Sequence, residues 1–205
     1  MSIEAWLAFV AASTILVMIP GPTVLLVVSY ALGQGWRAAL PTAIGVALGD
    51  FTAVTLSLLG VGALLATSAT LFTMLKLAGA AYLVWLGVKL WRAGGTLQTE
   101  ARTDRATSLA MILHAWIVTA LNPKGITFFV AFMPQFIDPR GDVLKQMLIL
   151  GATFLVLAFA NALAYGFLAA RAGAMARHPS AISLFNKLGG SLLIGAGVAA
   201  VTVRT

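Results

Sequence analysis

Cysteine is absent from the 205 residues of this chain, which excludes disulfide and thiol chemistry. Charged side chains are also scarce, at 9% of the residues, whereas about a quarter of an ordinary soluble chain is charged. The two histidines, His114 and His178, are too far apart in sequence to form a metal site. The chain also lacks a Walker loop, a dinucleotide fingerprint and a nucleophile elbow. We therefore expect no metal, no cofactor and no enzymatic activity.

Apolar residues dominate the chain instead. They make up 60% of the sequence, and the mean hydropathy is +0.99, which predicts an all-α, polytopic integral membrane protein with a single membrane domain over 1–205. A net charge of +7 would suggest a nucleic-acid partner in a soluble protein. In a membrane protein the same charge reflects topology, because basic residues collect in cytoplasmic loops. We therefore expect contact with lipid and not with nucleic acid.

Six apolar segments approach or exceed the length of about 20 residues that a helix needs to cross a bilayer. The first lacks a basic leading region and a small-residue cleavage site, so we expect it to be retained as a span. The polar, Gly/Thr-rich stretch at about 93–107 is interpreted as a linker between a first repeat at about 1–92 and a second at about 108–205. The segments cover about 4–33, 39–63, 70–92, 108–136, 146–170 and 184–203.

Basic residues are divided unevenly between the two sets of loops. The richer set should face the cytoplasm, which would place both termini outside. The richer set holds Arg37, Lys89, Arg92, Arg102, Arg105, Arg171 and Arg177, with Lys187 nearby, and the poorer set holds Arg140, Lys145, Arg204 and Lys76.

Prolines interrupt the leading span of each half. Pro20-Gly21-Pro22 breaks the first span, and Asn122-Pro123-Lys124 breaks the fourth. Each half has three spans, an odd number, so the second half would be inserted upside down, as in transporters built from inverted repeats. Two alternatives stay open: the halves resemble each other by chance, or the breaks are packing kinks.

Asp50 lies near the middle of the second span, where a carboxylate costs about 3 kcal/mol and marks an ion or substrate pathway. Gly45 and Gly49 form a GxxxG face just before it, which allows a neighbouring backbone to approach closely. Lys124 lies deep in the fourth span, and Asp50 is its expected partner. Whether such a pair is a static bridge or opens during transport stays undecided.

The broken helices should create a site for a dipolar solute. A helix that restarts after Pro22 or Lys124 exposes unpaired N–H groups that attract a carboxylate. Carbonyl groups around Met18, Ile19 and Leu121 would be free to hold an ammonium or a water. The list of expected site residues is completed by Asn161 and Tyr165, one helical turn apart, which either line the pathway or make interhelical hydrogen bonds.

Four motifs, in order and covering nearly the whole chain, resemble those of the LysE/RhtB family of bacterial amino-acid exporters. The resemblance implies six helices in the inner membrane and efflux of amino acids or their derivatives driven by the proton-motive force. The family's patterns in the first, second and fourth helices carry over onto Pro20, Gly21, Pro22, Asp50, Asn122, Pro123 and Lys124. The motifs are Pro20-Gly21-Pro22, Gly45 to Asp50, Ala80 to Gly87, and Leu121 to Lys124.

The expected function is secondary active export from the cytoplasm by proton antiport. Amino acids or other small zwitterions and protons are the expected ligands, with a passive channel, or an exporter of another small solute or cation, as the alternative. Pocket size should depend on which bulky side chains face inward, and a homodimer stays open. Those side chains are Phe128, Phe129, Phe132, Met133 and Phe154.

Overall fold

The computed structural model describes residues 1–67, 106–138 and 140–172, with separate positions between 74 and 92 and between 183 and 198. These described residues contain helices and no strand, as the sequence predicted. The predicted linker at about 93–107 lies outside them up to residue 105, and the third and sixth predicted spans lie largely outside them. The same holds for several basic residues of the predicted topology, namely Lys76, Lys89, Arg102, Arg105, Arg177 and Arg204, and for His178.

The other four predicted spans are long apolar helices or bent helix pairs. Two helices are long and apolar enough to cross a membrane, or up to four spans if each bent pair counts as one. The first pair bends by 54° between its helices and the second by 44°. The elements are α1 (Ile3–Met18), α2 (Pro22–Gln34), a 3-10 turn (Trp36–Ala38), α3 (Ala39–Thr67), α5 (Ser108–Ala120), α6 (Pro123–Thr127), a π-helical turn (Phe128–Phe132), a 3-10 turn (Met133–Phe136) and α7 (Val143–Ala172).

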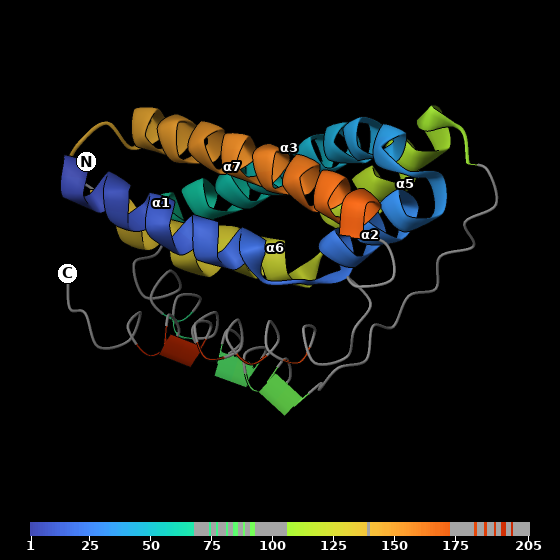
Figure 1. The fold of residues 1–205 in the computed structure, drawn as a ribbon. Helices are drawn as coiled ribbons and strands as arrows, with labels where there is room; N and C mark the ends of the chain where they lie inside the picture. The colour runs from blue at the N-terminus through green and yellow to red at the C-terminus, as the bar shows by residue number, and fades with distance from the viewer. Residues whose placement is uncertain are drawn as a thin grey trace.

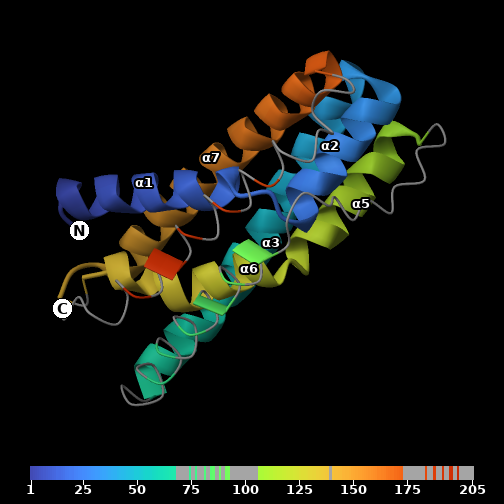
Figure 2. The same cartoon turned by 60° about the horizontal axis from the view of Figure 1, so that its bottom comes forward.

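Both bends lie at the interruptions that the prolines predicted, and Figure 2 shows the change of direction between α1 and α2. Ile19 has an extended backbone after α1, and Pro22 starts α2, where a missing N–H costs no hydrogen bond. At the second break, Asn122 is the N-cap of α6, and its side chain accepts a hydrogen bond from the backbone N–H of Lys124. Local backbone chemistry therefore explains both interruptions.

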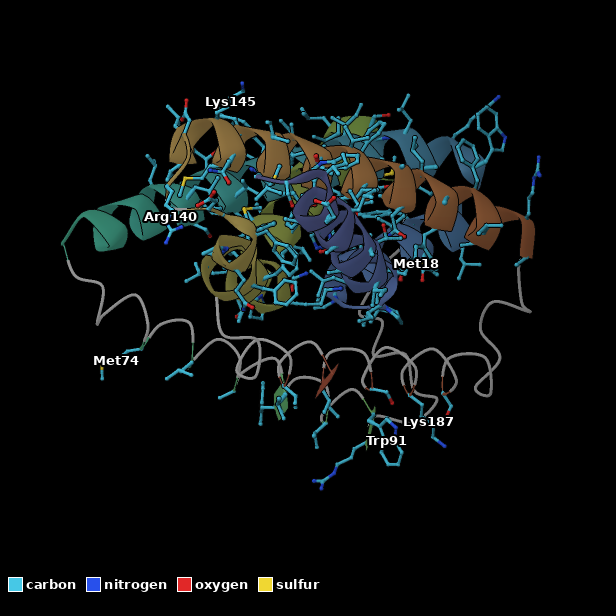
Figure 3. The ribbon with its side chains drawn as sticks, turned by 90° about the vertical axis from the view of Figure 1, so that its left-hand side faces the viewer. Met18, Met74, Trp91, Arg140, Lys145 and Lys187 are labelled. Carbon is cyan, nitrogen blue, oxygen red and sulfur yellow. The ribbon has the colours of Figure 1, made fainter. Side chains whose placement is uncertain are left out.

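The two broken helices run in opposite directions along the molecule (Figure 1). α1 and α2 lead away from the end where α7 begins, whereas α5 and α6 lead towards it. Arg140 and Lys145 lie at this end, beside the start of α7 (Figure 3). Trp36 and Arg171 line a hollow where α7 ends. The predicted separation of Arg171 from Arg140 and Lys145 thus matches two ends of the described helices.

α3 packs closely on α5 through its two glycines. A Cβ atom added to Gly45 would lie 2.4 Å from the carbonyl oxygen of Ile112, and one added to Gly49 would lie 2.5 Å from the Cβ of Thr119. Real Cβ atoms do not approach other atoms so closely, so these positions accept only glycine without a shift of the backbone. The contact fixes the rotation of α3 and carries Asp50, the next residue, to the interior.

This packing leads to a prediction about two glycines of the same helix. We expect Gly49→Ala to destabilise the protein by about 1–3 kcal/mol, the usual cost of overpacking. For a chain of this length that corresponds to a fall in Tm of about 2–4 °C per kcal/mol, measurable by thermal unfolding in detergent. The control is Gly60→Ala, because no atom of the described residues lies within 4 Å of a Cβ added there. Equal Tm values for the two variants would contradict the packing argument.

Candidate functional site

The C-terminal end of α1 is held by a lysine from the other broken helix. The Nζ of Lys124 donates hydrogen bonds to the carbonyl oxygens of Ile19, at 2.8 Å, and of Leu16, at 3.0 Å. α1 has no basic residue in its own last turn. A cation is favourable at this place, because the unpaired carbonyl groups form the negative end of the helix dipole.

α7 supplies the donors for the carbonyl groups of Val17 and Met18, which lie between Leu16 and Ile19. Asn161 donates from Nδ2 to the carbonyl oxygen of Val17 at 2.8 Å, and the hydroxyl of Tyr165 donates to that of Met18 at 2.7 Å. Four successive carbonyl groups of α1 and of the break therefore accept hydrogen bonds from side chains in the second half of the sequence. Asn161 and Tyr165 make interhelical hydrogen bonds, which was one of the two roles expected for them.

A chain of polar side chains joins the two breaks. Asn122 donates from Nδ2 to the Oγ1 of Thr23 at 3.0 Å, and this hydroxyl lies 3.2 Å from that of Thr119. Thr23 is in the first turn of α2, while Thr119 is in the last turn of α5. The amide of Asn122 thus caps α6 with its oxygen and bridges to α2 with its nitrogen.

Asp50 is buried in α3, with 7% of its surface exposed. Within the part of the chain that the structure describes, its carboxylate has no hydrogen bond and no ion pair within 4.0 Å. Lys124 is close enough to interact with it electrostatically. The close Asp50–Lys124 pair expected from the sequence is therefore not formed, because the ammonium group is hydrogen-bonded to α1.

A cavity of about 40 Å³ lies where the two breaks meet. Asp50 and Lys124 line it together with the first turn of α2, which has no side-chain cap. The rest of the wall is mainly apolar. The lining residues are Leu16, Val17, Thr23, Val24, Val27, Val46, Asp50, Asn122, Lys124, Gly125, Phe154, Ala158, Asn161 and Ala162.

Some expected site residues form this wall and others shape the backbone around it. The wall includes Asp50, Asn122, Lys124 and Asn161 but not Pro20, Gly21, Pro22, Pro123 or Tyr165. The carbonyl group of Ile19 holds an ammonium group, as expected, but it is that of Lys124 from this chain, and the carbonyl group of Met18 accepts from the hydroxyl of Tyr165. Leu121, whose carbonyl group was also expected to hold an ammonium or a water, is 71% exposed. Of the five bulky residues expected to set the pocket size, Phe154 alone lines the cavity.

Sequence reasoning missed Thr23 and Thr119. Thr23 directly follows the proline pair, and Thr119 precedes Asn122 by three residues, so it lies on the same side of the helix end. A hydroxyl beside each break was the signal that could have indicated the bridge.

Comparison with known proteins identifies the family. The family model described as LysE type translocator matches residues 14–204. The chain belongs to the LysE family of translocators. This confirms the resemblance stated from its motifs and makes it a membrane protein of a transport family. No solved structure matches this LysE-family chain.

Named relatives match along most or all of this LysE-family chain. An uncharacterized membrane protein of Vibrio cholerae is 36% identical over 204 residues, covering 100% of both chains. A homoserine/homoserine lactone efflux protein of Salmonella typhimurium is 34% identical over 204 residues, covering 100% of this chain and 99% of the relative. A leucine efflux protein of Enterobacter sp. is 34% identical over 153 residues, covering 74% of this chain and 72% of the relative.

The hydrogen bonds at the end of α1 can be tested with Tyr165→Phe. This change keeps the ring and leaves the carbonyl oxygen of Met18 without its donor. An interhelical hydrogen bond in a membrane protein contributes about 0.6–2 kcal/mol, so Tm in detergent should fall measurably. Thr14→Val is the control, because within the described part of the chain the Thr14 hydroxyl bonds to the carbonyl oxygen of Val10, in its own helix. If Tyr165→Phe changed Tm no more than this control, the bond to Met18 would not hold the break.

Proposed function

We propose that this protein exports amino acids or amino-acid derivatives from the cytoplasm by proton antiport. One observation carries the proposal: a buried carboxylate with no hydrogen bond among the described residues and an uncapped helix N-terminus line the same cavity. A carboxylate of the substrate would bind at the first turn of α2, where N–H groups are unpaired. The ammonium group of the substrate would bind at Asp50. Such a site is complementary to a zwitterion.

The names of the relatives support both the substrate class and the direction of transport. Two of them are named as efflux proteins, one for homoserine and homoserine lactone and the other for leucine. Homoserine and leucine both carry an α-carboxylate and an α-ammonium group. The mainly apolar remainder of the cavity wall favours a neutral side chain over a charged one.

The size of the cavity supports a closed, substrate-free state. Its volume of about 40 Å³ has room for about two or three water molecules. Small-molecule sites usually measure about 300–1,000 Å³. Transport would require the two broken helices and α7 to separate on one side of the membrane at a time. Competition between a proton and the substrate ammonium for Asp50 would couple the two fluxes, because each ligand shifts the equilibrium only through its different affinity for the two states.

The wider architecture follows from the same proposal. The opposite directions of the two broken helices support two inverted repeats of three helices each, at about 1–92 and 108–205. The site would lie between these repeats, near the middle of the bacterial inner membrane. Both termini would face outward, with the ends of α2 and α7 and the start of α5 at the cytoplasmic side. The protein would contact lipid over its apolar outer surface, either alone or as a homodimer.

Asp50→Asn tests the role of the carboxylate. The variant should still insert into the membrane and should lose proton-coupled efflux, because an amide can neither release a proton nor hold the substrate ammonium by charge. Efflux of labelled homoserine and leucine from proteoliposomes with an imposed pH gradient measures the effect. Asp142→Asn is the matched control, because Asp142 is exposed and its side chain only accepts from the backbone N–H of Lys145, as an asparagine also would. Efflux by Asp50→Asn at the wild-type rate would refute the assigned role.

Counterflow separates the exporter from a passive channel. Unlabelled homoserine or leucine inside proteoliposomes should stimulate uptake of the same labelled compound, since a carrier returns faster when it is loaded. A pore passes labelled solute without this stimulation. Absence of trans-stimulation, in vesicles that do transport the solute, would favour the channel.

A further inference from the structure

The ammonium group of Lys124 occupies a position formed by the main chain of the other broken helix. Its two acceptors are the carbonyl oxygens of Leu16, in the last turn of α1, and of Ile19, which follows that helix. The two distances, 3.0 and 2.8 Å, are those of charge-assisted hydrogen bonds. Lys124 reaches this position from α6, more than 100 residues further along the chain. A long side chain therefore carries a positive charge to the end of α1, where the carbonyl oxygen of Leu16 also accepts from the backbone N–H of Ile19 at 3.2 Å.

Carbonyl groups at such a position have a known use in membrane transporters. Where a spanning helix is broken, the unwound carbonyl groups and the C-terminal end of the half-helix coordinate the coupling cation, often sodium. Carbonyl oxygens replace the hydration shell of a metal ion in channel selectivity filters, and they also accept hydrogen bonds from an ammonium group. The carbonyl groups of Leu16 and Ile19 lie at such a broken helix end. The cation that they bind here is the ammonium group of Lys124, from the same chain.

The surroundings of the ammonium group are also those of a monovalent cation site. Asp50 lines the same cavity and, when ionised, supplies one negative charge without a direct bond to Lys124. Gly21 lies beside the ammonium group, since a Cβ atom added to it would lie 3.5 Å from the Nζ of Lys124. Without a side chain, Gly21 leaves this space open. One cation thus balances one carboxylate, and a second cation would leave the cavity with an uncompensated charge. Among the described residues the ammonium group has two acceptors, so its third N–H makes no hydrogen bond there, and Lys124 lines the cavity.

We propose that the carbonyl groups of Leu16 and Ile19 form a monovalent-cation site that this chain fills, in the closed state, with the ammonium group of Lys124. The transport cycle then needs no sodium or potassium ion, because the ammonium group of Lys124 binds the carbonyl oxygens that such an ion would otherwise coordinate. The site would become available to an external cation when the lysine side chain is shortened. This inference does not depend on the identity of the exported solute.

Chemical rescue of Lys124→Ala tests the site without any transport assay. The full-length variant, purified in detergent, should have a lower Tm than the wild-type protein in choline chloride. Replacing choline by about 100 mM methylammonium, sodium or potassium should raise the Tm of the variant by roughly 2–4 °C, because a ligand that binds only the folded state stabilises it. The wild-type protein and Lys145→Ala, which alters an exposed lysine, should show no such rise. A variant Tm that responds to none of the three cations more than these controls would overturn the proposal.

A second measurement decides the matter if Lys124→Ala does not fold. Wild-type protein in proteoliposomes should transport at the same rate when sodium and potassium are both replaced by choline at a fixed pH gradient. A rate that falls several-fold without one of these ions would overturn the proposal. Because the Tm experiment involves no substrate, a failure of the proposed export function would leave the cation result unaffected, and the reverse also holds.

Discussion

The structure depends on how the last carbonyl groups of α1 are satisfied. A helix that stops inside a spanning segment leaves these groups without N–H partners, and lipid offers no water to replace them. Here the donors are Lys124, Asn161 and Tyr165, all from the second half of the sequence. In this state, side chains from the second half of the sequence therefore satisfy the break in the first helix. These hydrogen bonds tie the local backbone of α1 to the global arrangement of the protein.

The hydrogen bonds of Lys124 to α1 determine how charge is arranged in the cavity. Its ammonium group is hydrogen-bonded to main-chain oxygens, so Asp50 keeps a carboxylate that is buried, compensated at a distance and open to another ligand. Asp50 reaches this place because Gly49 allows α3 to lie against α5. The bridge from Asn122 to Thr23 keeps the start of α2 beside the same cavity. Three separate packing contacts thus meet at one small cavity.

The positions of the two helix breaks could be predicted from the sequence, because they depend on the residues at the breaks themselves. Pro20, Pro22 and Pro123 remove backbone donors, so the positions of both breaks follow from the residues alone. The hydrogen-bond partners could not be predicted, because they depend on which side chain reaches which carbonyl group across the bundle. The sequence indicated a direct pair between Lys124 and Asp50, whereas the side chain of Lys124 extends to Ile19. The hydroxyl groups of Thr23 and Thr119 were missed for the same reason.

The most direct test of the central claim is a solid-state NMR measurement in lipid bilayers. Protein labelled with ¹⁵N at lysine side chains and with ¹³C at isoleucine carbonyl and aspartate carboxyl groups should show a measurable dipolar coupling between the Nζ of Lys124 and the carbonyl carbon of Ile19. The same signal should be absent from Lys124→Met, which assigns it. Our account predicts this coupling in the substrate-free protein. A Lys124 ammonium group coupled to the carboxylate carbon of Asp50, and not to Ile19, would contradict it.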